Sequence, residues 1–237
     1  MKSLWRAIFY SLAIVAAQPA TPLDQFVDLE SPQKIAEART KIEALAFEDL
    51  TEKDFAAEKD LSQYSHLDPH RLVPPHLLES SLLYYDKNQT RFTNQSYIAV
   101  VDFGVRSDVA RFYLVNLKSG EVERHYTTHG KGSDRNNDGL AESFGNEVNS
   151  GKSSLGPIRT AAIYYGKFNR SLRLDGLSKS NNQMRQRAVT LHGWDEVKEA
   201  PVIQGLSYGC LTFDWTIKDD IVDKLKDGAL IYVGQSQ

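Results

Sequence analysis

The sequence has very little cysteine: Cys210 is the only one among 237 residues. A lone cysteine excludes an internal disulfide and any zinc site made of several thiolates. Such a thiol is buried and inert, paired between two chains, or used for chemistry. No second cysteine is available to complete a zinc site, so we expect no metal and no cofactor.

A long hydrophobic run is also missing. The apolar run over residues 7–17 is about 11 residues long, whereas a membrane-spanning helix needs about 20. Lys2 and Arg6 precede this run, and the small residues Val15–Ala17 suit proteolytic cleavage. Residues 1–17 are therefore predicted to be a secretory signal peptide, with a retained N-terminal anchor as the alternative. We expect the protein in the periplasm or cell envelope, without an integral membrane segment after signal removal.

The sequence also lacks an excess of positive charge. The formal net charge is −3, and it becomes about −5 without Lys2 and Arg6. No basic stripe is available to neutralise phosphates, which argues against a nucleic-acid partner. With 41% hydrophobic and 25% charged residues, the composition is that of a globular protein with a sizeable core. We expect one main domain, over residues 75–237, behind an N-terminal extension.

The extension, residues 18–74, is predicted to be helical and to end in a linker. Ser31 suits a helix N-cap, and apolar residues recur at three- and four-residue spacing through residue 46. Thr51 with Asp54 resembles a capping box and predicts a second short helix. These helices either pack against the catalytic domain or serve in substrate gating or partner docking.

The rest of the chain favours an α+β fold that is mainly β. Runs rich in Val, Ile, Tyr and Thr predict strands, and Lys118–Gly120 suits a hairpin turn between two of them. Apolar spacing predicts helices over residues 76–85 and 216–226. The predicted strands are residues 96–103, 110–117, 121–128, 156–165, 188–192 and 229–233.

A histidine lies 18 residues before the cysteine. His192 follows a strand-like segment and precedes Gly193, while Cys210 follows Gly209 in a polar segment. A free thiol has a pKa of about 8.5 and needs a base or a cation to become a nucleophile at neutral pH. The glycine would also let backbone N–H groups face an oxyanion. The pair is a candidate for nucleophilic catalysis, although spacing alone is a weak signal.

These residues resemble a known active-site motif. Leu191-His192-Gly193 followed by Ser207-Tyr208-Gly209-Cys210 is similar to the motif of the murein L,D-transpeptidase catalytic-domain family. Further segments resemble the same family in the same order, so that the resemblance covers residues 75–234. They are residues 97–103, 111–113, 129–133, 144–146, 150–156 and 172–177, then Asn182 and Arg187.

The resemblance implies a β-rich fold and peptidoglycan stem peptides as substrate. Cys210 would be the nucleophile that attacks the third residue of a stem peptide and expels its terminal D-alanine. His192 would accept the thiol proton or stabilise a preformed thiolate, and would then act as general base and acid. Backbone N–H groups of Tyr208, Gly209 and Cys210 would form the oxyanion hole. An amine of a neighbouring stem would then complete a cross-link. The implied substrate-binding residues are Gly193, Trp194, Ser207, His129, Arg173 and Arg187.

Two departures concern substrate binding. The broad superfamily commonly has histidine where this chain has Tyr208, and a basic or amide residue where it has Thr212. They leave nucleophile and base in place, and they suggest that an arginine among positions 173, 185 and 187 holds the stem carboxylate. Asp195 or Glu196 could orient His192, as could a backbone carbonyl. Trp194, Tyr164, Tyr165 and Trp215 form an aromatic wall or pack in the core.

Two other activities remain open. With water in place of the amine, the same chemistry gives an L,D-carboxypeptidase or endopeptidase. A non-catalytic peptidoglycan-binding protein is the alternative from a different class.

Residues 134–139 resemble the start of a calcium loop, but Gly145 stands where such a loop needs a bidentate glutamate, so a solvated turn is the default.

Overall fold

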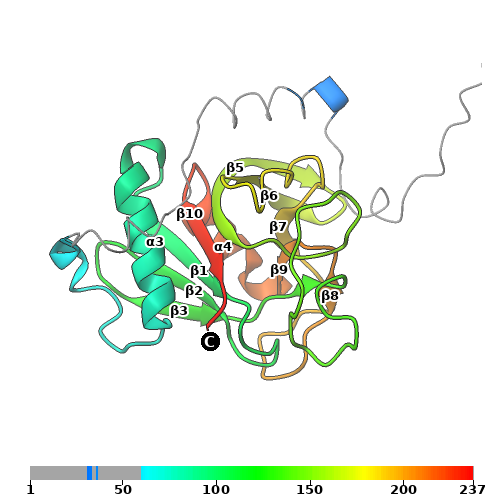
Figure 1. Ribbon diagram of the computed structural model, residues 1–237, viewed down its shortest axis with the longest axis horizontal. Helices are drawn as coiled ribbons and strands as arrows, with labels where there is room; N and C mark the ends of the chain where they lie inside the picture. Colours follow the sequence, from blue (N-terminus) through cyan, green and yellow to red (C-terminus); the bar gives the residue numbers. More distant parts are fainter. Residues whose placement is uncertain (1–30, 34–35, 37–59, 237) are drawn as a thin grey trace, which may run out of the picture.

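The computed structural model describes residues 31–33, 36 and 60–236 (Figure 1). The predicted signal peptide and most of the first two predicted helices lie outside these residues. Within them the chain is mainly β, as predicted. None of the described helices is long and apolar enough to cross a membrane.

An eight-stranded sheet forms the centre of the molecule, in the order β3-β2-β1-β10-β5-β6-β7-β9. β10 runs parallel to β1 and antiparallel to β5. A second sheet pairs β4 with β8. The strands are β1 (Tyr97–Asp102), β2 (Phe112–Asn116), β3 (Val122–His125), β4 (His129–Gly130), β5 (Gly156–Gly166), β6 (Asn169–Gly176), β7 (Thr190–Gly193), β8 (Leu206–Ser207), β9 (Leu211–Phe213) and β10 (Leu230–Gly234).

Alternating apolar residues bury both faces of this sheet. In β1, Ile98 and Val100 join one hydrophobic cluster, whereas Ala99 and Val101 join another. The helix α3 (Pro75–Asn88) packs with the first cluster and α4 (Trp215–Leu225) with the second. The sheet therefore has a helix on each face (Figure 1).

Local signals explain both helices. Pro75 stands in the first turn of α3, where its missing N–H costs nothing, and Asp214 caps α4 by accepting from Thr216 N at 2.9 Å. The predicted helices at 76–85 and 216–226 are confirmed, and α3 is longer than predicted. Short 3₁₀ turns, η2 (Ser62–Tyr64) and η3 (Gln89–Arg91), flank α3.

The segment predicted as a linker is fixed to the domain. Asp68 accepts hydrogen bonds from Leu72 N and Val73 N at 2.8 Å, and the side chains of Leu67 and Val73 are buried.

Candidate active site

Two parallel strands bring Cys210 and His192 to one face of the sheet. β7 and β9 pair with His192 beside Thr212, and Cys210 stands two residues before Thr212. Side chains two residues apart on an extended segment share a face. Cys210 and His192 accordingly line the same cavity, which has a volume of about 300 Å³.

The thiol of Cys210 is buried, with 6% of the residue exposed. Sγ accepts from Thr190 N at 3.5 Å and lies 3.8 Å from the carbonyl oxygen of Ala188. Burial raises the pKa of the Cys210 thiol, and the hydrogen bonds from Thr190 and the charge of Arg187 oppose that rise. The environment therefore keeps the thiol protonated at rest.

The imidazole of His192 is held in one tautomer. Its Nδ1 lies 2.9 Å from the Gly193 carbonyl oxygen. A carbonyl oxygen only accepts, so Nδ1 carries the hydrogen and Nε2 keeps a lone pair. Phe168 stacks on the ring with centroids 4.0 Å apart, and burial lowers the pKa of His192 to about 4. Within the described residues no hydrogen bond joins His192 to Cys210, so the resting pair is neutral and separate.

The turn before Cys210 requires glycine. Gly209 has φ +105°, and a Cβ there would lie 2.5 Å from the Lys152 carbonyl oxygen. Gly209 N donates to Ser207 Oγ at 3.1 Å. The Cys210 carbonyl accepts from Ser207 Oγ at 2.9 Å and from Thr128 Oγ1 at 3.2 Å. These contacts fix the backbone on both sides of the sulfur.

Arg187 lines the cavity and is buried, with 6% exposed. Its guanidinium donates to Gly145 O at 3.0 Å, to Ser154 Oγ at 2.6 Å and to Lys152 O. Within the described residues no carboxylate forms an ion pair with it. Burial lowers the pKa of Arg187, whereas negative charge on a Cys210 thiolate would raise it. Arg187 is thus a cation that could face a thiolate or a substrate carboxylate.

The other two arginines lie outside the cavity lining. Arg173 stacks over the Tyr164 ring at 4.1 Å, and Arg185 donates to Asp175 at 2.5 Å. Trp215 Nε1 donates to the Asp195 carboxylate at 2.7 Å. Asp195 therefore bonds to the Trp215 indole and not to His192. The backbone carbonyl of Gly193 is therefore the group that orients His192.

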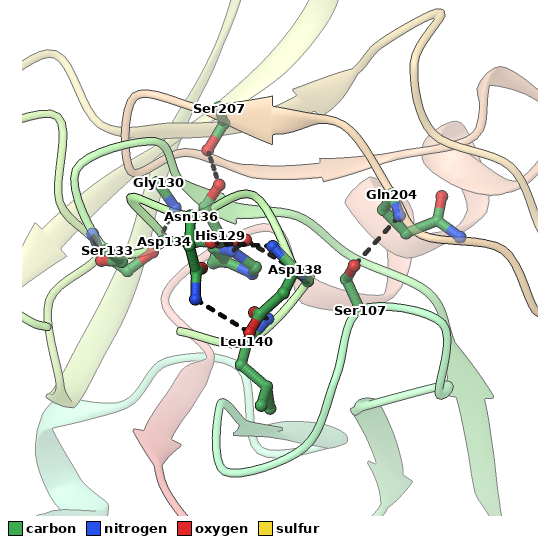
Figure 2. A network of polar contacts seen from close by, with 12 residues as sticks. Ser107, His129, Gly130, Ser133, Asp134, Asn136, Asp138, Leu140, Gln204 and Ser207 are labelled. Carbon is green, nitrogen blue, oxygen red and sulfur yellow. Dashed lines mark hydrogen bonds and ion pairs between the residues drawn. The ribbon is translucent and has the colours of Figure 1, made fainter. Parts of the chain in front are cut away.

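His129 lies in a buried polar network rather than in the cavity lining (Figure 2). Arg111 donates to His129 Nδ1 at 2.7 Å, so Nδ1 is an acceptor and Nε2 donates to Asp134 at 3.2 Å. Burial, then the charge of Arg111, lowers the pKa of His129 to about 4. Any influence of His129 on substrate would pass through the loop that Asp134 holds.

That loop is organised by its own hydrogen bonds. Asp134 accepts from Gly139 N at 2.9 Å and from Asp138 N at 3.2 Å. Asp138 accepts from Leu140 N at 2.9 Å (Figure 2). The carboxylates that resemble calcium ligands thus serve the turn itself.

Several cavity residues were not predicted. Trp194, Ser207 and Tyr208 line the cavity as expected, and Gly193 adjoins His192. Lys131, Phe168 and Leu206 also line it, and Glu196 does so without bonding to His192. Phe168 lies in the two-residue turn between β5 and β6, where no sequence signal points to His192.

Comparison with known proteins agrees with the motif. The profile of the L,D-transpeptidase catalytic-domain family matches residues 70–233. No curated protein matches the chain.

Solved structures include similar proteins at low identity. An L,D-transpeptidase from Mycobacterium smegmatis is 14% identical, with 59% of this chain and 58% of that chain covered and a TM-score of 0.37. L,D-transpeptidase 1 of Mycobacterium tuberculosis is 12% identical, with 58% of this chain and 61% of that chain covered and a TM-score of 0.33. An L,D-transpeptidase from Stackebrandtia nassauensis is 11% identical, with 89% of this chain and 95% of that chain covered and a TM-score of 0.37. The chain spans less than two thirds of the two mycobacterial proteins.

Proposed function

The chain belongs to the L,D-transpeptidase catalytic-domain family, and on that premise we propose that it is a cysteine L,D-transpeptidase acting on peptidoglycan stem peptides in the cell envelope. The observation that carries the proposal is the pairing of β7 with β9. It sets a thiol and a histidine with a free Nε2 lone pair on one face, in one cavity. A nucleophile and an oriented base are the minimum for acyl transfer.

In the first half-reaction, Cys210 Sγ attacks the carbonyl carbon of the third stem residue. The thiol proton passes to His192 Nε2 and then to the nitrogen of the departing D-alanine. The S–C bond forms as the C–N bond breaks, which leaves a thioester on Cys210. Because both groups are neutral at rest, His192 acts as a general base and not as the partner of a preformed thiolate.

The transition state places negative charge on the former carbonyl oxygen. Backbone N–H groups of the 208–210 turn are the proposed donors, and each is worth about 3 kcal/mol where it is well placed. The Gly209 N–H now donates to Ser207 Oγ, so its use requires that bond to open. Arg187 adds positive charge at the same end of the cavity, where it would hold a stem carboxylate or offset the oxyanion.

Mass spectrometry of the intact protein tests this function. After incubation with a purified stem tetrapeptide, we expect an adduct on Cys210 equal to the donor minus D-alanine, with release of one equivalent of D-alanine. Cys210→Ser is the control and should give neither product. A reduced, folded protein that forms no adduct with any stem length contradicts the enzymatic proposal. Binding that survives Cys210→Ser unchanged, without adduct in the parent, supports a non-catalytic binding protein.

A further inference from the structure

A second cavity of about 360 Å³ lies beside the cavity at Cys210. Both are lined by Lys131, Glu196 and Leu206, and the second extends to Asn137 and Gln204. The two cavities therefore adjoin each other along these three residues. A reaction that joins two substrates at one sulfur needs two such spaces.

Glu196 stands at the boundary with a free carboxylate. Its side chain is exposed, and within the described residues it forms neither a hydrogen bond nor an ion pair. Among the described residues that line the first cavity, it is the only acidic one. Asp134 also lines the second cavity, but it accepts hydrogen bonds from Gly139 N and His129 Nε2.

The backbone beneath this carboxylate is rigid. Gly205 N donates to the Glu196 carbonyl at 2.9 Å and closes the intervening loop. Gln204 fills the loop, since its side chain accepts from Lys198 N at 2.8 Å and donates to Val202 O at 2.7 Å. Ser107 Oγ accepts from Gln204 N at 3.1 Å and ties the loop to the domain (Figure 2). The backbone that carries Glu196 is thus held in place by the loop, and its exposed side chain extends from a fixed position.

We propose that Glu196 binds the side-chain ammonium of the second substrate, an amine-bearing stem peptide held in the second cavity, and thereby favours transfer to an amine over transfer to water. The inference rests on the proposed function and assigns a residue of this chain to the acceptor. A carboxylate at this boundary attracts a cationic acceptor and has no such effect on water. Glu196 is a positioning residue for that acceptor.

The second half-reaction then follows in balanced steps. The bound ammonium releases one proton to solvent, and the neutral amine attacks the thioester carbon. The new C–N bond forms as the C–S bond breaks. The second proton passes from nitrogen through His192 Nε2 to Sγ, which restores the thiol.

The test measures how the acyl-enzyme divides between transfer and hydrolysis. The acceptor is a stem tripeptide with a free side-chain amine, compared with hydroxylamine, which is uncharged at neutral pH. Glu196→Gln should lower the transfer-to-hydrolysis ratio for the tripeptide about fivefold, the upper range for an exposed ion pair, and should leave the ratio for hydroxylamine unchanged. Glu196→Asp keeps the charge and should recover most of the lost transfer.

Asp195→Asn is the matched control, because it removes the same charge one residue away and keeps an acceptor for Trp215 Nε1. An equal ratio in Glu196→Gln and Asp195→Asn overturns the inference, as does an equal loss for both acceptors. If the parent protein forms no adduct on Cys210, the proposed function fails and the inference fails with it. A normal adduct with unchanged amine transfer in Glu196→Gln overturns the inference alone.

Discussion

Acidification from about pH 7 to about pH 5 should remove about 4 kcal/mol from the free energy of unfolding. The perturbation acts on two histidines, His129 and His192, whose pKa values burial lowers to about 4. In the unfolded chain a histidine has a pKa of about 6.5. Between these values the unfolded state binds more protons than the folded state, so stability falls as the pH falls through this window and is unaffected above it.

The magnitude follows from the two pKa values. Each pKa unit corresponds to about 1.4 kcal/mol, and at about pH 5 each histidine contributes about 2 kcal/mol of destabilisation. Carboxylates such as Asp134 and Asp223 contribute little to this change, because their pKa values are lowered from 3.8. The stability that they add is lost only below about pH 4. A loss of 4 kcal/mol is a large part of the stability of an ordinary domain.

Urea unfolding at the two pH values measures this loss, with coincident spectroscopic probes as the check for two-state behaviour. His192→Gln removes one of the two groups, so its pH-dependent loss should be about 2 kcal/mol. His70→Gln is the control, because His70 is exposed, and it should keep the full loss. A loss below about 1 kcal/mol in the parent, or an equal loss in His192→Gln, refutes the reasoning.

Three further predictions concern the site. Phe168→Ala uncovers one face of His192 and should raise its pKa, moving the acid limb of the kcat/KM profile up by about one pH unit, whereas Phe168→Leu should move it little. Thr128→Val loses the bonds to Cys210 O and Thr212 Oγ1 and should cost about 1–3 kcal/mol in thermal unfolding. Adding Thr212→Val should cost less than the sum, and additivity would contradict the shared bond. Gly209→Ala should lower stability by about 1–3 kcal/mol through backbone strain, and an unchanged melting temperature would exclude that strain.

Periodic segments of the sequence were enough to predict most of the sheet. The runs that became β1, β2, β5 and β10 are rich in β-branched and aromatic residues, and the four-residue spacing of Ile217, Ile221 and Leu225 identified α4. The strands β4, β8 and β9 have two or three residues each, which is too short for a period. Their pairing depends on neighbours brought from elsewhere in the chain. β6 was not predicted as a strand, because its Arg173 and Asp175 interrupt the apolar run.

The proposed nucleophile, Cys210, and the proposed base, His192, were recognisable because each belongs to an ordered motif. Phe168 and Lys131 were not, since they reach the cavity from the β5–β6 turn and from the segment after β4. His129 shows the reverse case. The sequence placed it near a family motif but could not reveal that Arg111 and Asp134 occupy both ring nitrogens. Side-chain direction at such positions is set by tertiary contacts that no local pattern encodes.

The central position of β10 has a consequence for how the chain assembles. Strands β3-β2-β1 lie on one side of it and β5-β6-β7-β9 on the other, and within the sheet only these five residues join the two groups. A chain that emerges from a channel with its N-terminal end first presents every other strand before this one. Until β10 has emerged, β1 and β5 each have one edge without a partner strand. The complete sheet therefore assembles only after residue 234 has emerged.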